Sequence, residues 1–322
     1  MAYKIMIMGA SYGSLLASKI LFGGHSVHLI CLPAEADLIN SEGFKVRLPV
    51  RGRKDQVLLE SRKLPGKVTA GGVDSANPND FDLIGLAMQE PQYRSPGVRE
   101  LLDKVARSGK PCMSIMNMPP LPYVKRIPGL DYAKLEVAYT DPRVWDSFDP
   151  ATLTLCSPDP QAFRPPDEKI NVLQVTLPTN FKVARFDSDK YTAMLRQLEA
   201  DIEASRLDTG TGKIELPVKL KVYDSIFVPL AKWAMLLSGN YRCITKDGMR
   251  TAQEAVHSDI ETSRSVYNFV NDLCVRLGAN PADLVPFEKY AAAAQSLVRP
   301  ASAARALNNG VPNIERADKL VQ

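Results

Sequence analysis

Residues 3–14 read YKIMIMGASYGS, and LLASKIL follows directly at residues 15–21. The apolar run at 3–8 predicts a buried β-strand, and residues 15–21 predict an α-helix. Small residues form the turn between them. Backbone N–H groups in such a turn, together with the positive end of the helix dipole, can approach a pyrophosphate closely. We therefore expect a dinucleotide to contact the residues of the turn: Gly9, Ala10, Ser11, Tyr12, Gly13 and Ser14.

The turn departs from the usual dinucleotide fingerprint G-x-G-x-x-G. Ser11 stands where the second glycine would permit close approach of the pyrophosphate. Ser14 stands where the third would permit tight packing of helix on strand, and Gly13 lies one place out of register. An ordinary βα turn, whose small residues serve packing alone, is the alternative interpretation.

A second apolar run at residues 26–31 completes a βαβ unit, after a helix stop at 23–25. Enzymes that prefer NAD often carry an acidic residue at the end of this strand, and those that accept NADP often carry an arginine. Leu32 holds this position, so the residues leave both cofactors open. A basic cluster further along is expected in a solvated hairpin: Arg47, Arg51, Arg53 and Lys54.

Strand-like and helix-like stretches continue to alternate up to residue 116. Residues 80–88 read as a buried strand, 98–107 as a helix and 112–116 as another strand. This alternation predicts a parallel sheet with helices on both faces and ligands at the carboxyl ends of the strands. Three polar residues lie at such ends: Ser11, Gln89 and Asn117. The proline-rich residues 119–122 predict an extended loop beyond them.

The chain is organised differently from residue 130 onward. Four strand-like runs are separated by turn residues and prolines: 135–140, 152–156, 172–177 and 181–186. Because no helix separates the last two, we expect antiparallel pairing that extends the first sheet. An amphipathic helix over 188–206 and a short strand over 214–220 precede a mainly helical remainder. We therefore expect two domains, residues 1–220 and 221–322.

Length and composition agree with two domains. The chain has 322 residues, 45% of them hydrophobic, so it can bury a substantial core. A formal charge of +4 without a basic stripe argues against a nucleic-acid partner. No apolar run approaches the roughly 18 residues that cross a bilayer, and the chain starts with a strand rather than a signal segment. We therefore expect a soluble, cytoplasmic protein with no membrane partner.

The five cysteines are scattered singly, without C-x-x-C spacing. Their odd number and spacing argue against a disulfide framework or a zinc ribbon, so reduced thiols are expected. The three histidines, His25, His28 and His257, show no metal-ligand spacing. No metal site is predicted.

Residues 230–240 read LAKWAMLLSGN, which resembles the catalytic helix of the ketopantoate reductase (2-dehydropantoate 2-reductase) family. That family belongs to the larger 6-phosphogluconate dehydrogenase-like group, and its lysine is followed by asparagines four and eight places later. Lys232 matches the lysine and Asn240 the second asparagine, whereas Leu236 replaces the first. Positions i, i+4 and i+8 line one helix face over two turns. The resemblance implies that Lys232 faces the keto oxygen of the substrate.

Other positions of the family are matched one at a time. Asn117 resembles an asparagine that helps to hold cofactor and substrate, and Ser296 resembles a serine that binds the substrate. The family's glutamate about twelve places later is matched by Asn308. Its lysine at the fourth strand end is matched by Gln89, and its NADP-selecting arginine by Leu32.

The resemblance covers nearly the whole chain. It implies an α/β fold, in which a Rossmann-type doubly wound sheet is extended by antiparallel strands and followed by a mainly α-helical domain. It also implies a homodimer that transfers a hydride from NADP or NAD to a 2-oxo acid or related carbonyl, with Lys232 as general acid. Arg299 and Arg305 are candidate anchors for a carboxylate, because a guanidinium can bind one bidentately.

Two alternatives stay open. Three departures from the family pattern, Leu32, Leu236 and Asn308, favour a catalytically inactive nucleotide-binding sensor or scaffold. Exchanging an amide for an isobutyl group in a polar site changes the substrate or removes activity. The same two-domain plan leaves open an opine-dehydrogenase-like enzyme as the second alternative.

Overall fold

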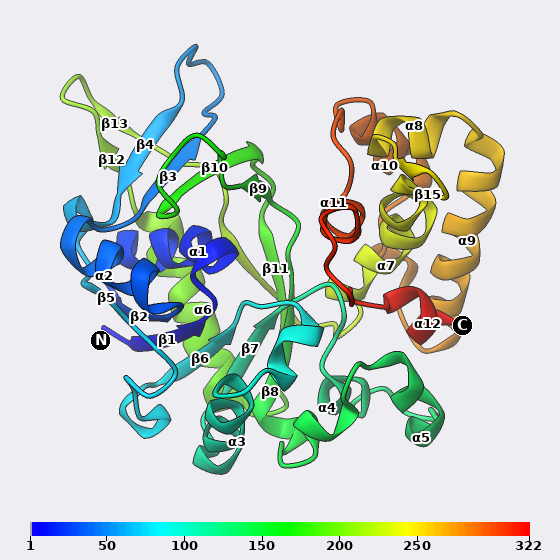
Figure 1. Cartoon of the computed structure of the whole chain (residues 1–322), viewed down its shortest axis with the longest axis horizontal. Helices are drawn as coiled ribbons and strands as arrows, with labels where there is room; N and C mark the ends of the chain where they lie inside the picture. Colours follow the sequence, from blue (N-terminus) through cyan, green and yellow to red (C-terminus); the bar gives the residue numbers. More distant parts are fainter. Residues whose placement is uncertain (1) are drawn as a thin grey trace.

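The computed structural model of the chain describes residues 2–322 (Figure 1). Its largest element is an eight-stranded sheet with the order β14-β11-β8-β7-β6-β1-β2-β5. The strands are β1 (Lys4–Met8), β2 (Ser26–Ile30), β5 (Val68–Gly71), β6 (Leu83–Leu86), β7 (Cys112–Ile115), β8 (Leu153–Ser157), β11 (Phe181–Ala184) and β14 (Leu220–Tyr223). All neighbours pair in parallel except β8 and β11. The predicted α/β fold class is confirmed.

Helices cover both faces of this sheet, because successive side chains of a strand point to opposite sides. Ile5 and Ile7 of β1 pack in one core with α1 (Ala10–Phe22) and α6 (Asp189–Ala204). Met6 and Met8 pack in the other core with α3 (Val98–Ser108). A further helix, α2 (Pro33–Glu42), lies beside the edge strand β5. The doubly wound arrangement therefore follows from the fully apolar β1.

A second, four-stranded sheet has the order β4-β3-β10-β9. Its strands are β3 (Lys45–Leu48), β4 (Val57–Glu60), β9 (Gln161–Phe163) and β10 (Val172–Leu177). The expectation that 172–177 extends the first sheet is wrong, because β10 pairs in parallel with β3 and antiparallel with β9. The hairpin β3–β4 offers a free strand edge, and β10 pairs with it. Only β11 extends the large sheet, antiparallel to β8.

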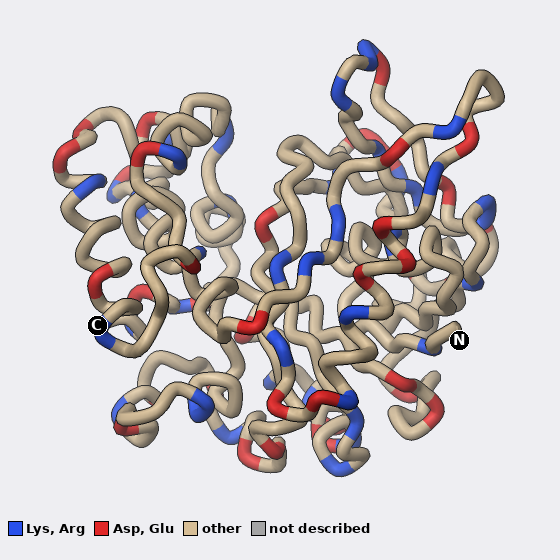
Figure 2. Tube along the Cα trace, turned by 180° about the vertical axis from the view of Figure 1, so that it is seen from behind, with Lys and Arg blue, Asp and Glu red and all other residues tan. Residues whose placement is uncertain are grey.

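The expected basic hairpin is β3–β4, and Lys and Arg residues lie along the chain up to its tip in the view from behind (Figure 2). Arg51, Arg53 and Lys54 are exposed there, as predicted for a solvated turn. Arg47 is bound by Glu168 instead.

Three local predictions are wrong. Residues 135–140, expected as a strand, form the end of α5 (Tyr132–Leu135) and a 3₁₀ turn. Val137 is 76% exposed, so the apolar residues of this run do not form the buried face of a strand. The expected strand over 214–220 is split into β13 (Lys213–Ile214) and β14, because Pro217 cannot donate a ladder hydrogen bond and Val218 has a left-handed φ of 66°. A one-turn helix, α4 (Leu121–Val124), replaces part of the expected loop at 119–122. Its proline lies in the first turn, where a missing N–H costs little.

The remainder of the chain is mainly helical and packs beside the ends of the sheet strands (Figure 1). Its elements are α7 (Lys232–Met235), α8 (Ala252–His257), α9 (Ile260–Arg276), α10 (Phe287–Ala294), α11 (Ser302–Asn308) and α12 (Ala317–Val321), with the two-stranded ribbon β15 (Ile244–Thr245)–β16 (Gly248–Met249). A second two-stranded ribbon, β12 (Leu207–Asp208)–β13, belongs to the sheet part of the chain and precedes β14. Tyr267, Phe287 and Tyr290 form an aromatic cluster that joins α9 to α10. Among the described residues, every helix is too short or too polar to span a bilayer.

Candidate active site

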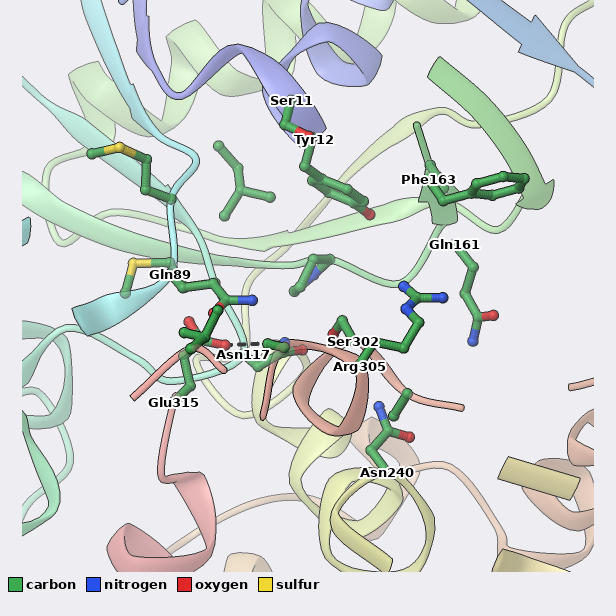
Figure 3. Close-up of a pocket in the computed structure, with 18 of the residues that line it drawn as sticks. Ser11, Tyr12, Gln89, Asn117, Gln161, Phe163, Asn240, Ser302, Arg305 and Glu315 are labelled. Atoms are coloured by element: carbon green, nitrogen blue, oxygen red, sulfur yellow. Dashed lines mark hydrogen bonds between the residues drawn. The ribbon is translucent and has the colours of Figure 1, made fainter. Parts of the chain in front are cut away.

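A cavity of about 720 Å³ lies between the carboxyl ends of the sheet strands and the helical part of the chain. Ser11 from the start of α1, Gln89 after β6 and Asn117 after β7 line it from the sheet side. Lys232 and Asn240 line it from the helical side. Figure 3 shows Ser11, Gln89, Asn117 and Asn240 around this space.

The turn after β1 is tighter than the sequence predicts, because α1 begins at Ala10. Gly9 has a φ of 102°, and a Cβ atom there would lie 2.7 Å from Cγ of Met88 and 2.8 Å from the carbonyl oxygen of Ala87. A Cβ on Gly13 would lie 2.9 Å from Cγ2 of Ile7. Gly13 therefore serves the tight packing of helix on strand that the fingerprint assigns to the position of Ser14.

The start of α1 is open to the cavity at Ser11, which is exposed. Ala10, Gly13 and Ser14 are buried behind it, and the Ser14 hydroxyl donates to the carbonyl of Ala10. The first turn of a helix leaves N–H groups without partners inside the helix, and α1 carries no acidic residue there. The start of the helix thus suits an anion.

Tyr12 lies in the cavity wall next to this helix start. Its hydroxyl donates to the carbonyl of Pro160 at 2.6 Å, and its ring forms a T-shaped pair with the ring of Phe181, the two centroids 5.9 Å apart. Burial raises the pKa of the Tyr12 phenol, and the charge of Asp159 raises it further. The neutral side chain therefore joins α1 to the segment that follows β8.

Lys232 reaches the cavity with its ammonium group beside a carboxylate. Its Nζ lies 3.5 Å from Oδ1 of Asp159, whose Oδ2 lies 3.1 Å from Nζ of Lys182. The Ser157 hydroxyl donates to the same carboxylate at 2.7 Å. Burial raises the pKa of Asp159, but the two ammonium groups more than offset it, so the pKa lies below the usual range. Asp159 is thus an ionised counter-charge for both lysines.

A π-helical turn, Leu236–Asn240, follows α7 and sets the direction of Asn240. In a regular α-helix eight residues turn by about 800°, which would leave Asn240 about 80° away from Lys232. A π turn takes up an additional residue, so Asn240 returns to the face of Lys232. Leu236 is buried, and its side chain belongs to the core.

Glu315 is a cavity residue that the sequence does not single out. Its carboxylate accepts a hydrogen bond from Nδ2 of Asn117 at 3.1 Å and faces the backbone N–H of Glu90 at 3.4 Å. Burial raises its pKa to about 7, although the bond from Asn117 lowers it. Asn308, the position matched to the family's glutamate, is exposed and outside the cavity wall. In the sequence, Glu315 is marked only as an acidic residue that follows the apolar Ile314.

Asp159 was also missed, although it follows the carboxyl end of β8 in the same way as Asn117 follows β7. Its flanking prolines, Pro158 and Pro160, obscured this in the sequence.

Two of the predicted site residues lie outside the cavity. Ser296 is exposed and donates to the carbonyl of Ala293, and Leu32 is 74% exposed and does not line the cavity.

The histidines and the metal-binding side chains bear on the opine-type reaction and on a metal site. His257 bonds to the carbonyl of Ala291 and does not line the cavity, so this pocket offers no histidine to an opine-type reaction. Within residues 2–322, no group of three histidine, cysteine or acidic side chains could hold a metal ion.

No protein-family model matches the chain, and no curated protein matches it in sequence. Solved structures match it over most of their length. A PanE/ApbA family ketopantoate reductase from Ralstonia eutropha JMP134 has a TM-score of 0.61 at 13% identity, covering 99% of this chain and 90% of that one. A dimeric ketopantoate reductase from Staphylococcus aureus has a TM-score of 0.51 at 10% identity, covering 99% and 97%. A D-mandelate dehydrogenase solved with NADH and anilino(oxo)acetate has a TM-score of 0.54 at 14% identity, covering 92% and 80%.

These similarities show the class of fold. Like the reductase and the mandelate dehydrogenase, the chain combines a Rossmann-type sheet with a helical part. More particularly, it has the fold of ketopantoate reductases, as the resemblance of its sequence predicts.

Proposed function

We propose that the chain is a nicotinamide-dependent oxidoreductase that reduces a 2-oxo acid or related carbonyl compound. The observation that carries this proposal is that Lys232, Asn117 and Ser11 line one cavity. A cation, an amide and an open helix start then face the same ligand space. The mandelate dehydrogenase of the same fold was solved with NADH and a 2-oxo acid derivative, which supports this ligand class.

The residues at the sheet edge fit a dinucleotide. The start of α1 faces the cavity at Ser11 without an acidic side chain, so its N–H groups are suited to a pyrophosphate. Gln89 and Asn117 would contact the nicotinamide half from neighbouring strand ends. When bound, the cofactor supplies the hydride. Leu32 selects neither form at the end of β2, so we propose NADP or NAD.

Lys232 would act as the general acid. Its ammonium group would stabilise the negative charge that develops on the carbonyl oxygen and then donate a proton to it. Asp159 keeps this ammonium group in place through its 3.5 Å contact. Asn240, on the same helix face, would bind a second oxygen of the substrate. We also propose a homodimer, because the Staphylococcus aureus reductase of this fold is dimeric.

One observation favours a second candidate, a nucleotide-binding protein without catalysis. The ammonium group of Lys232 already contacts Asp159, and a buried leucine replaces the first asparagine of the family's helix. Both features would suit a site that keeps a cofactor but has lost its reaction.

The test is titration with NADPH and NADH, followed by turnover with a series of 2-oxo acids. Trp233 adjoins Lys232, so tryptophan fluorescence can report cofactor binding. Lys232→Met should lower kcat by about 100-fold or more and leave cofactor affinity nearly unchanged. Lys246→Met, in an exposed turn, is the matched control and should change neither. Absence of cofactor binding would refute the reductase, and binding with no turnover would favour the sensor.

A further inference from the structure

We propose that Arg299 and Arg305 together bind an acidic group, a carboxylate or a phosphate, of the substrate. Both residues line the same cavity as Lys232 and Asn240. The identity of the rest of the ligand rests on the proposed function, but the anion site itself does not.

The two arginines lack partners. Across residues 2–322, neither side chain forms an ion pair or donates a hydrogen bond, whereas Arg47 and Arg126 are paired with Glu168 and Asp187. Arg305 is half-buried, so its charge has lost part of its hydration without gaining a counter-charge. An unpaired charge of this kind costs free energy until an anion binds.

The two guanidinium groups also act on each other. Burial lowers the pKa of Arg305, and the charge of Arg299 lowers it further. Like charges in a partly buried space repel one another. One anion between them would offset both charges, and each planar fork can donate two hydrogen bonds to it.

The surroundings hold the pair in place. Arg299 is exposed, and its guanidinium carbon lies over the ring of Phe163, 4.2 Å from the ring centroid, so this cation–π contact restricts where the group can lie. Arg305 projects from α11 into the space between Phe163 and Asn240 (Figure 3). Among the described residues, Glu315 is the one acidic side chain in the cavity wall.

The position favours the substrate over the cofactor. The start of α1, on the sheet side, already offers donors for the cofactor's pyrophosphate. Both arginines come from the helical side, as do Lys232 and Asn240. The acidic group and the reacting carbonyl would therefore be bound by the same part of the chain.

The test uses inorganic phosphate as the probe, titrated into the whole chain and followed by ³¹P NMR. Arg299→Met and Arg305→Met should each weaken phosphate binding by about tenfold or more, because a charge-assisted bidentate contact is lost. Arg305→Lys keeps the charge and should give an intermediate loss. Arg276→Met removes an exposed arginine outside the cavity and should stay within about twofold of the unchanged chain. Circular dichroism checks that each variant is folded.

A second arm separates substrate from cofactor. NADPH and NADH affinities should be unchanged in the two cavity variants, and phosphate should compete with oxamate, an unreactive analogue of a 2-oxo acid. A selective loss of NADPH affinity would assign the pair to the 2′-phosphate and overturn the proposal. Failure of the unchanged chain to bind phosphate, or equal binding by every variant, would also overturn it. The phosphate titration needs no turnover, so its result is independent of the hydride-transfer test.

Discussion

The ammonium group of Lys232 lies 3.5 Å from Oδ1 of Asp159. Lys232 belongs to the helical part of the chain, and Asp159 follows β8 of the large sheet. The ion pair therefore joins the helical wall of the cavity to the segment after β8, in which Pro158 and Pro160 on either side of Asp159 line the cavity. Lys182 and Ser157 contact the same carboxylate, so Asp159 carries the polar contacts of three side chains.

Asp159→Asn should lower the free energy of unfolding by about 2 kcal/mol, because two partly buried lysines lose their counter-charge. Urea unfolding measures this loss. Asp167→Asn, at an exposed position, is the control and should stay near zero. Equal stability of both variants would show that solvent screens the two lysines.

Glu315 should make stability depend on pH. Its pKa of about 7 in the folded chain exceeds its ordinary value of 4.5. The folded state therefore holds the proton more tightly, and stability falls as pH rises from about 4.5 to 7, by about 3 kcal/mol in full. Glu315→Gln should remove this fall and be more stable than the unchanged chain at pH 8. Unfolding at pH 5 and pH 8 measures it, with the exposed Glu136→Gln as control; parallel pH dependence of all three chains would contradict it.

Lys19 should change stability with pH in the opposite direction to Glu315. It is 1% exposed, its Nζ donates to the carbonyl of Pro217 at 2.7 Å, and burial lowers its pKa to about 7. The unfolded chain binds the proton more tightly, so stability rises between about pH 7 and pH 10.5. At pH 6, Lys19→Met should raise the free energy of unfolding by about 2 kcal/mol, after allowing for the lost hydrogen bond. This increase should be smaller at pH 10.

Guanidinium chloride unfolding at the two pH values measures the effect of Lys19→Met. Lys104→Met removes an exposed lysine from the middle of α3 and should show no such change with pH. A constant difference between Lys19→Met and the unchanged chain from pH 6 to pH 10 would show that Lys19 keeps its proton when folded.

Gly9→Ala should destabilise the chain by about 3 kcal/mol, because it places a side chain at a left-handed φ and against the Ala87 carbonyl. Gly72→Ala is the matched control, since a Cβ there meets no atom within 4 Å. Thermal unfolding compares the two. Similar melting temperatures would mean that the turn after β1 can relax.

Local patterns are enough to predict the first part of the sheet. The unit of β1, α1 and β2, and later β6, α3 and β7, each carry their own signal of apolar runs and helix stops. Pairing between distant segments leaves no such signal. Residues 172–177 read correctly as a strand, but their partner is a hairpin more than a hundred residues earlier. The division at residue 220 stays a prediction, although the large sheet ends at Tyr223.

The site shows the same limit. Ser11, Gln89, Asn117, Lys232 and Asn240 line one cavity, but their roles stay predictions. Asp159 contacts Lys232, 73 positions away, and Glu315 contacts Asn117, 198 positions away. A single sequence does not show such contacts. The resemblance matches Ser296 to the family's serine within the residues QSLVR at 295–299. It lies just after α10, exposed and outside the cavity wall, although its neighbour Leu297 lines the cavity.

The π turn at Leu236–Asn240 holds one residue more than a regular helix needs to bring Asn240 to the face of Lys232. Loss of a single codon in this turn would leave a rotation of about 700° in a regular helix, so the asparagine would stay within about 20° of that face. Closing the turn into a regular helix without a deletion would instead turn Asn240 about 80° away. The segment therefore tolerates a shorter chain better than a substitution that favours regular helix.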